Sequence, residues 1–360
     1  MNHFSVIREK LIEAGLDGLL LTCEHNRFYA SGFATMADED GMVLITKEKN
    51  YFITDSRYTE AAEAQLVDTV LIERLGKDSY LDILKKLVPE NGVEKLGFED
   101  AAMTVKEYRE YTEGLDCEFI PASDVVLNLR QSKDRDEIQS MIAAQRIAEK
   151  ALAQLLEEIK IGMTEKEIAA RLQYLLLLNG AERMAFLPIV ASGPNSSMPH
   201  AVPTDRKVQA GDFVTIDYGA VFNGYLSDTT RTVAVGYATN EMKKVYEVVL
   251  EAQQKGIATA KTGVAGKEVH EAAHDVIRAA GYGEYFGHGF GHSLGLQVHE
   301  APNFNPRNEK PMPEGAVVSA EPGIYLPGKF GVRIEDVVIV RENGCDDITL
   351  FPKELTVIPG

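Results

Sequence analysis

The chain has 360 residues, a hydrophobic content of 45% and a formal net charge of −18. Because this length exceeds what one hydrophobic core usually serves, we expect two globular domains and not a disordered chain. The acidic balance, with no basic stripe interleaved with aromatic residues, would repel a phosphate backbone and argues against a nucleic-acid partner.

The N-terminus and the cysteines indicate where the protein works. Residues 1–22 predict an amphipathic helix followed by a short strand, and not an export signal. No apolar run approaches the ~20 residues that span a bilayer. The three cysteines are odd in number and widely spaced, which predicts neither a disulfide framework nor a thiolate zinc site. We therefore expect a soluble protein of the reducing cytoplasm with no membrane partner.

Short β-prone runs alternate with helical patterns in the first third of the chain, which predicts an α/β domain. Two of its helices carry start signals. Ser79 precedes a periodic apolar run, and Thr104 with Glu107 forms a capping-box pattern. The expected strands cover residues 18–22, 42–46, 51–54, 69–73, 95–98 and 117–120.

Two further helices are predicted after this domain. A long amphipathic helix is expected from about Ser132, with acidic residues from Asp134 onward in its first turn, and Gly162 is expected to end it. Thr164 and Glu167 form another capping-box pattern and open the next helix. The polar connection before the long helix is where we place the domain boundary.

A predicted hairpin lies in residues 212–235, where two β-prone runs flank Asn223-Gly224, the strongest short hairpin signal. With these two turn residues, Asp217 lies opposite Thr230, and Asp228 falls on the same face as a diagonal neighbour of Asp217. Two solvated aspartates on an ordinary hairpin are the alternative. However, aspartate is depleted in strands, and a buried carboxylate is costly without a positive partner.

Three of the eight histidines, His288, His292 and His299, lie in the glycine-rich segment 287–300. His288 and His292 have the i, i+4 spacing of a helical metal motif. The interleaved glycines disfavour a helix by about 1 kcal/mol each, so we expect a tight loop that enters a strand. Taken alone, this loop fits a structural turn as well as a metal site.

Two apolar strands, expected at residues 317–325 and 332–340, supply further acids. Glu321 stands at the end of the first strand, before a Pro-Gly turn. Strand alternation places Glu335 and Arg333 on one face of the second strand, so a buried salt bridge between them is the structural interpretation, and it is compatible with a metal role for Glu335.

Together these segments offer one imidazole and four carboxylates, a hard ligand set that favours a close pair of manganese, cobalt, iron or zinc ions. Such a pair would activate a water and polarise a carbonyl group. The five candidate metal ligands are Asp217, Asp228, His292, Glu321 and Glu335.

In this order, the blocks resemble the pita-bread metallopeptidases, in the branch of proline peptidases with a creatinase-like N-terminal domain. The resemblance covers essentially the whole chain and includes Asn26–Phe33 (NRFYASGF), Phe52–Tyr58 (FITDSRY) and Ile189–Asn195 (IVASGPN), which leads to His200. It implies an α+β protein, with an α/β creatinase-like domain over residues 1–128 and a pita-bread catalytic domain over residues 129–360.

The resemblance also implies roles for the five ligands. Asp217 would bind one metal, His292 and Glu321 the other, and Asp228 and Glu335 would bridge the two. A hydroxide between the metals would attack the scissile carbonyl, and Glu321 would pass a proton to the leaving nitrogen.

Four more catalytic residues follow from the same resemblance. His200, His288 and His299 correspond to accessory and substrate-contacting histidines, and Arg333 to the arginine of the site. His200 and His299 would steady the oxyanion and the proline carbonyl. Without the resemblance, His200 would be interpreted as a solvated histidine in a proline-rich loop.

The implied substrates are dipeptides or short peptides with an Xaa-Pro bond. Phe186, Ile189 and Val298 are the candidate apolar wall for the proline ring, and core packing explains each equally well. Chain length favours the dipeptidase over the aminopeptidase. A dipeptidase should offer a cation to the free carboxylate, and Arg307 is a candidate. Neither the specificity nor the residue preferred before proline follows from the sequence.

In this family the N-terminal domain covers the partner subunit's site in a homodimer, and the acidic loop Ala37–Asp40 is our candidate for that cover, with a solvated loop as the alternative. Other functions are weighed against the peptidase. A non-catalytic pita-bread peptide-binding protein or a creatinase-like amidinohydrolase would leave the metal ligands unexplained. Methionine aminopeptidases share the catalytic domain but usually lack the N-terminal one.

Overall fold

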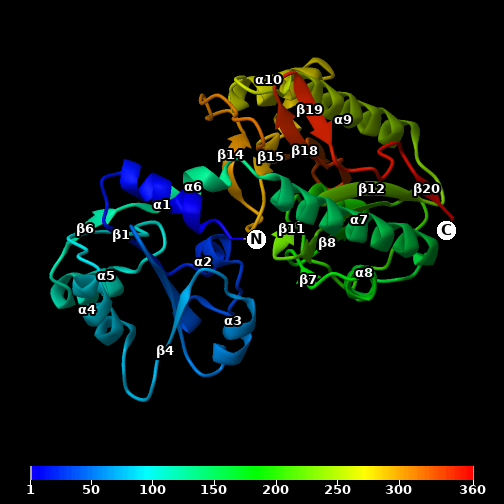
Figure 1. Ribbon diagram of the computed structural model, residues 1–360. Coiled ribbons are helices and arrows are strands. Elements are labelled where there is room, and N and C mark those ends of the chain that lie inside the picture. Colours follow the sequence, from blue (N-terminus) through cyan, green and yellow to red (C-terminus); the bar gives the residue numbers. More distant parts are fainter. Residues whose placement is uncertain (1, 360) are drawn as a thin grey trace. The chain divides into compact units, whose positions relative to one another are not determined.

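The computed structural model describes residues 2–359, and the chain divides into two compact units, residues 1–130 and 131–360 (Figure 1). The division falls within the segment between Leu127 and Ser132. Each unit is described by itself. No helix in the described part of the chain is long and apolar enough to cross a lipid bilayer.

The N-terminal unit is built on a six-stranded mixed sheet. Its strands are β1 Gly18–Leu21, β2 Gly41–Thr46, β3 Asn50–Thr54, β4 Val70–Glu73, β5 Lys95–Phe98 and β6 Glu118–Pro121. They run in the order β4-β3-β2-β1-β5-β6, with β1, β2 and β3 antiparallel and the outer strands parallel to their neighbours. All six strands expected from the sequence are confirmed.

Both N-terminal helix starts are also confirmed. The helices are α1 Phe4–Glu13, α2 Glu24–Ser31, α3 Thr59–Gln65, α4 Tyr80–Glu90, α5 Val105–Gly114 and α6 Ser123–Arg130. Ser79 and Asp82 cap α4 reciprocally, and Thr104 and Glu107 do the same for α5. Apolar side chains of α4, including Leu84 in the middle of the helix, pack into the core with those of the central strands.

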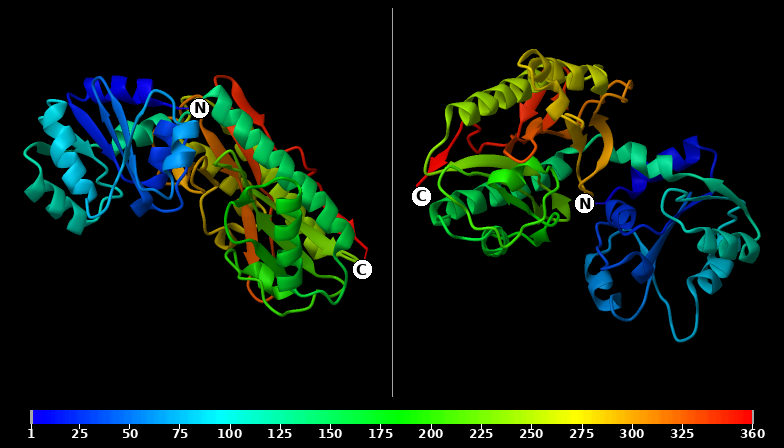
Figure 2. Two further views of the ribbon diagram at one scale, coloured as in Figure 1. Left: turned by 60° about the horizontal axis from the view of Figure 1, so that its bottom comes forward. Right: turned by 180° about the vertical axis from the view of Figure 1, so that it is seen from behind.

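The C-terminal unit consists of two halves, each with helices on a sheet (Figure 2). Its helices are α7 Arg135–Glu158, α8 Glu165–Leu178, α9 Asn240–Thr259 and α10 Gly266–Ala279. Its strands are β7 Arg183–Met184, β8 Ile189–Ser192, β9 Phe213–Tyr218, β10 Ala220–Phe222, β11 Tyr225–Leu226, β12 Thr229–Val235, β13 Gly291–Ser293, β14 Glu300–Phe304, β15 Val317–Ala320, β16 Gly323–Leu326, β17 Phe330–Arg333, β18 Asp336–Arg341, β19 Gly344–Asp347 and β20 Val357–Ile358.

In the first half, α7 and α8 pack on the sheet β20-β12-β9-β8; in the second, α9 and α10 pack on the strands around β15 and β18 of the sheet β14-β13-β15-β18-β19. The long helix α7 starts at Arg135, later than expected. The Asp134 side chain accepts hydrogen bonds from the amides of Asp136 and Glu137, so Asp134 caps the helix and does not belong to its first turn. The helix also ends before Gly162. The capping box of Thr164 and Glu167 on α8 is confirmed.

The hairpin register is confirmed. Phe222 pairs with Tyr225 across the Asn223-Gly224 turn, and Asp217 pairs with Thr230. The ladder is interrupted between these pairs, where a Cβ on Gly219 would overlap the Ser227 carbonyl oxygen. The interruption leaves the count of residues equal on both sides, so the face of each side chain is preserved.

Both acid-bearing segments are divided into two strands. The end of the first strand at the Pro-Gly turn beside Glu321 is as expected, whereas the break in the second corrects the expectation of one continuous strand. β15 ends before Glu321 and β16 begins at Gly323, because Pro322 has no amide hydrogen for a ladder. β17 ends at Arg333 and β18 begins at Asp336, because the Glu335 amide donates to the Thr230 carbonyl instead. Both glutamates therefore stand at strand breaks.

Candidate metal centre

The five predicted ligands converge between the two halves of the C-terminal unit. Asp217 lies in β9, Asp228 precedes β12, His292 lies in β13, Glu321 follows β15 and Glu335 precedes β18. The His292 Nε2 atom lies 3.4 Å from Glu321 Oε1 and 3.7 Å from Asp228 Oδ2. One ligand atom each from Asp228, His292 and Glu335 lie within 4.8 Å of one another.

Backbone contacts orient the His292 ring. Its Nδ1 atom lies 3.3 Å from the Ser293 carbonyl oxygen, which holds a proton on Nδ1. The lone pair on Nε2 then faces the carboxylates. Burial lowers the pKa of His292, so the ring is neutral at physiological pH and can donate this lone pair to a cation.

No lysine or arginine side chain in the described part of the chain pairs with the buried carboxyl groups of Asp228 and Glu335, whereas Asp217 pairs with Arg333. Burial, together with the charges of Asp217 and Glu321, raises the pKa of Asp228. Burial, together with Asp228, likewise raises the pKa of Glu335. Clustered buried carboxylates are unstable in the ionised form unless a positive charge meets them.

The free oxygen atoms at the site fit a metal ion. The Oδ1 atoms of Asp217 and Asp228 are buried, and neither has a hydrogen-bond partner among the described residues. Buried acceptors rarely remain unpaired. A divalent cation bound to such oxygens and to an imidazole holds its ligand atoms about 3–4 Å apart. The donor set and its geometry therefore fit divalent metal ions.

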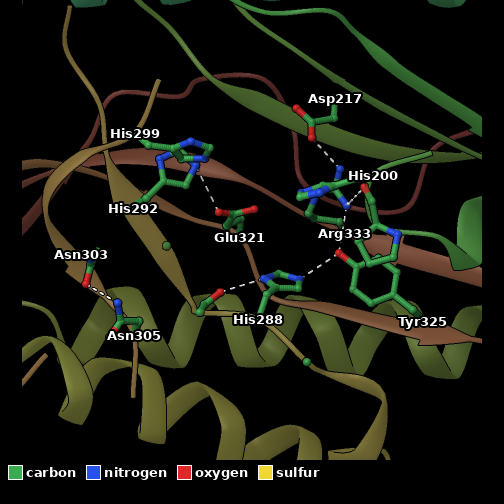
Figure 3. A pocket seen from close by; sticks show the side chains of 14 residues that line it. His200, Asp217, His288, His292, His299, Asn303, Asn305, Glu321, Tyr325 and Arg333 are labelled. Atoms are coloured by element: carbon green, nitrogen blue, oxygen red, sulfur yellow. Dashed lines mark hydrogen bonds and ion pairs between the residues drawn. The ribbon is translucent and has the colours of Figure 1, made fainter. Parts of the chain in front are cut away.

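Arg333 is bound on the rim of this cluster through a chain of side chains (Figure 3). Its Nη2 atom donates to Asp217 Oδ2 at 2.6 Å, and its Nη1 atom donates to the Tyr325 hydroxyl at 2.9 Å. That hydroxyl lies 2.9 Å from His288 Nε2, and His288 Nδ1 lies 2.8 Å from the Gly289 carbonyl. The salt bridge considered between Arg333 and Glu335 is therefore not formed, because Asp217 takes the guanidinium.

A cavity of about 590 Å³ opens onto the cluster. His200 and His299 are exposed on its rim, and the His299 ring packs edge-on against His292 with centroids 4.4 Å apart. The lining residues are Pro199, His200, Asp217, Gly287, His288, Gly289, Gly291, His292, His299, Asn303, Asn305, Glu321, Tyr325 and Arg333. Asp228 and Glu335 are not among them and are almost fully buried.

The expected apolar wall is not part of this lining. Phe186, Ile189 and Val298 are half-buried, and Ile189 pairs with Asp217 in the ladder between β8 and β9. Arg307 is exposed and does not line the cavity, where Asn303 and Asn305 lie instead. Arg307 lies outside the cavity because of the direction that the loop after β14 takes. No local sequence pattern predicts that direction.

Sequence reasoning missed Tyr325 and Thr230. The Thr230 hydroxyl donates to Glu335 Oε2 at 2.7 Å and accepts from Arg333 Nε at 3.1 Å. The hairpin register contained a signal for Thr230, since it places this residue directly opposite Asp217. No comparable signal marks Tyr325, whose hydroxyl joins Arg333 of the neighbouring strand to His288, which is 37 residues away in the sequence.

Known proteins are similar to this chain in both of its units. Residues 139–342 match metallopeptidase family M24, and residues 5–132 match the creatinase/prolidase N-terminal domain. An Xaa-Pro dipeptidase of Pyrococcus furiosus is 37% identical, over 96% of this chain and 98% of its own.

Two solved structures are similar throughout. An Xaa-Pro dipeptidase from Bacillus anthracis is 42% identical with a TM-score of 0.93, covering 99% of both chains. An X-Pro aminopeptidase from Thermotoga maritima is 39% identical with a TM-score of 0.91, covering 97% of this chain and 100% of its own. The α+β architecture expected from the sequence is thereby confirmed.

Proposed function

The chain belongs to metallopeptidase family M24, and on that premise we propose that it is an Xaa-Pro dipeptidase. The observation that carries the proposal is the convergence of Asp217, Asp228, His292, Glu321 and Glu335 beside an open cavity. All five ligands are present, which argues against a non-catalytic peptide-binding protein.

Two divalent metals, held by these five residues, would polarise the scissile carbonyl and activate a water molecule. Burial raises the pKa of Glu321, which suits this carboxyl for holding a proton and delivering it to the leaving nitrogen. His200 and His299, exposed on the rim, would orient the substrate carbonyls. Arg333 holds Asp217 in place, while His288 supports Arg333 through the Tyr325 hydroxyl.

We propose manganese as the natural metal, with cobalt, zinc and iron as alternatives. Four carboxylates and one imidazole offer mostly hard oxygen donors, which manganese accepts readily. Removal of metal by a chelator, followed by addition of each ion separately, measures which one restores the highest turnover. Greater restoration by zinc than by manganese would contradict this part of the proposal.

An Xaa-Pro aminopeptidase is the second candidate, and a specific observation favours it. A free proline carboxylate calls for a cation, yet Arg307 does not line the cavity and Arg333 is engaged by Asp217. Hydrolysis of Ala-Pro and Ala-Pro-Ala separates the two candidates. Faster cleavage of Ala-Pro supports the dipeptidase, whereas faster cleavage of Ala-Pro-Ala moves the protein to the aminopeptidases. No metal-dependent cleavage of either would overturn both.

The assembly and the location are further proposals. We propose a homodimer, on the resemblance to two-domain proline peptidases, with the loop Ala37–Asp40 as the covering segment. A fully active monomer in analytical ultracentrifugation would contradict it. We propose a cytoplasmic location because Cys23, Cys117 and Cys345 form no disulfide, which suits a compartment that keeps thiols reduced. Cell fractionation checks this.

A further inference from the structure

His200 lies in a segment that follows β8 in the chain. Both ends of this segment lie beside the first turn of α8. The segment runs from Ser192 through the 3-10 turn η2, Gly193–Ser197, past His200 to Thr204. His200 is exposed, and its ring makes no hydrogen bond to any described residue. Its place on the cavity rim must therefore be fixed by the backbone that carries it.

Both ends of this segment meet on one carboxylate. Glu165, at the first position of α8, is completely buried. Its Oε1 atom accepts from the Ser192 amide at 2.7 Å and from the Ser192 hydroxyl at 2.8 Å. Its Oε2 atom accepts from the Thr204 amide at 2.9 Å and from the Thr204 hydroxyl at 2.6 Å. The Asn195 amide group lies 3.1 and 3.2 Å from the two oxygens.

The carboxylate must be charged for this arrangement. Burial by itself would raise the pKa of Glu165, but the hydrogen bonds from Thr204 and Ser192 outweigh it and lower the pKa. All of these groups donate hydrogen bonds to the carboxylate, so a protonated or amide side chain would turn a donor toward other donors. A neutral glutamine is therefore a poor substitute.

The far side of the segment is attached to the catalytic residues. The Ser196 hydroxyl accepts from the amide of Gly331 at 2.9 Å, and Gly331 lies in β17, two residues before Arg333. Arg333 Nη1 also donates to the Pro199 carbonyl at 3.3 Å. The segment is thus held at its base by Glu165 and at its tip by the arginine that binds Asp217.

We propose that Glu165 is a positioning residue for His200, because its carboxylate closes the base of segment 192–204 and fixes His200 on the cavity rim. This inference rests on the proposed function, in which His200 orients the substrate. It adds a residue outside the cavity to the set that determines turnover.

Glu165→Gln tests the proposal, with Glu167→Gln as the matched control. Glu167 belongs to the same first turn of α8 and caps the helix through Thr164, but its side chain makes no hydrogen bond to the described residues of the segment. The metal-loaded variants are compared with the wild type by amide hydrogen exchange of residues 193–203 and by kcat and KM for Ala-Pro. Glu165→Gln should speed exchange and lower kcat about tenfold to a hundredfold at unchanged metal content. Glu167→Gln should change neither.

A double variant separates positioning from general destabilisation. In a His200→Ala background, Glu165→Gln should reduce kcat no further than about twofold, because its effect passes through His200. The proposal would be overturned if the double variant lost kcat by the product of the two single-variant factors. It would also be overturned if the amide hydrogens of Glu165→Gln exchanged at the wild-type rate. If Glu165→Gln does not fold, Ser192→Ala and Thr204→Val each remove one hydroxyl donor and should show smaller changes of the same kind. If the wild type cleaves no Xaa-Pro bond, the proposed function is wrong. The hydrogen-exchange rates of residues 193–203 then still test whether Glu165 holds the segment in place.

Discussion

Glu335 and Asp336 are neighbours at the start of β18, equally buried, and their surroundings are opposite. Asp336 accepts from Arg231 Nη2 at 2.7 Å and from Gln253 Nε2 at 2.7 Å, and it also pairs with Lys353. Despite burial, these two cations lower the pKa of Asp336. On the other side, burial and neighbouring carboxylates raise the pKa of Glu335, whose side chain has only the Thr230 hydroxyl as a donor among the described residues.

The difference shows where the chain supplies its own positive charge and where it does not. Around Asp336, the buried acid is neutralised by internal cations, and the result is a structural network. Arg231 also donates to the Glu335 carbonyl oxygen and so fixes the backbone next to the metal ligand. Around Glu335, acids outnumber cations, which is the arrangement that a metal cofactor completes. One side therefore contributes stability, and the other requires a ligand.

The largest expected effect is on the metal side. Asp228→Ala removes a proposed bridging ligand, and we expect loss of turnover on the order of 10³-fold or more, together with loss of bound metal. Activity on Ala-Pro and metal content by mass spectrometry measure both losses, and circular dichroism should show the fold retained. Normal turnover in this variant would refute the proposed ligand set.

The next largest effect is expected at Asp336, which the chain's own cations neutralise. Asp336→Asn should lower the free energy of unfolding by about 3–5 kcal/mol, with or without metal, because it leaves Arg231 buried without its anion. Urea denaturation measures the change. The matched control is Asp346→Asn, which breaks the exposed pair with Arg341 and should cost about 0–1 kcal/mol. If both substitutions lowered the free energy of unfolding equally, the stabilising role assigned to the buried pair of Asp336 and Arg231 would be wrong.

The smallest effect has the opposite sign. In metal-free protein at pH 8, Glu335→Gln should raise the free energy of unfolding by about 1–2 kcal/mol, since it removes an uncompensated buried charge. Because the folded-state pKa of Glu335 is raised, this penalty is absent below the unfolded pKa near 4 and grows as pH rises. The stabilisation should therefore vanish at pH 4.

Thermal unfolding with chelator at both pH values measures this difference. The histidines titrate in both proteins, so their contribution largely cancels in the comparison. Saturating metal should reverse the sign, because the neutral amide of the variant cannot replace a carboxylate ligand. A variant less stable than the wild type without metal at pH 8 would show that Glu335 is already neutralised within the chain.

Local patterns account for much of what the sequence could predict. The Asn223-Gly224 turn set the register that pairs Asp217 with Thr230, and the start signal at Ser79 and the capping boxes at Thr104 and Thr164 located three helix starts. These signals act within a few residues, so the chain itself encodes them.

Features that depend on distant contacts were not predictable in this way. Arg333 binds Asp217, and not its near neighbour Glu335, because β9 and β17 meet only in the folded unit. Strand alternation alone could not show that β17 ends before Glu335. The role of Tyr325, and the absence of Phe186 and Arg307 from the cavity lining, likewise follow from tertiary packing.

The central claim is that Asp217, Asp228, His292, Glu321 and Glu335 bind two divalent metal ions. Anomalous diffraction from crystals grown with manganese tests it most directly. We predict two manganese peaks per chain, with carboxylate oxygens of Asp228 and Glu335 contacting both ions. A single ion, or manganese bound away from these residues in an active enzyme, would contradict the account.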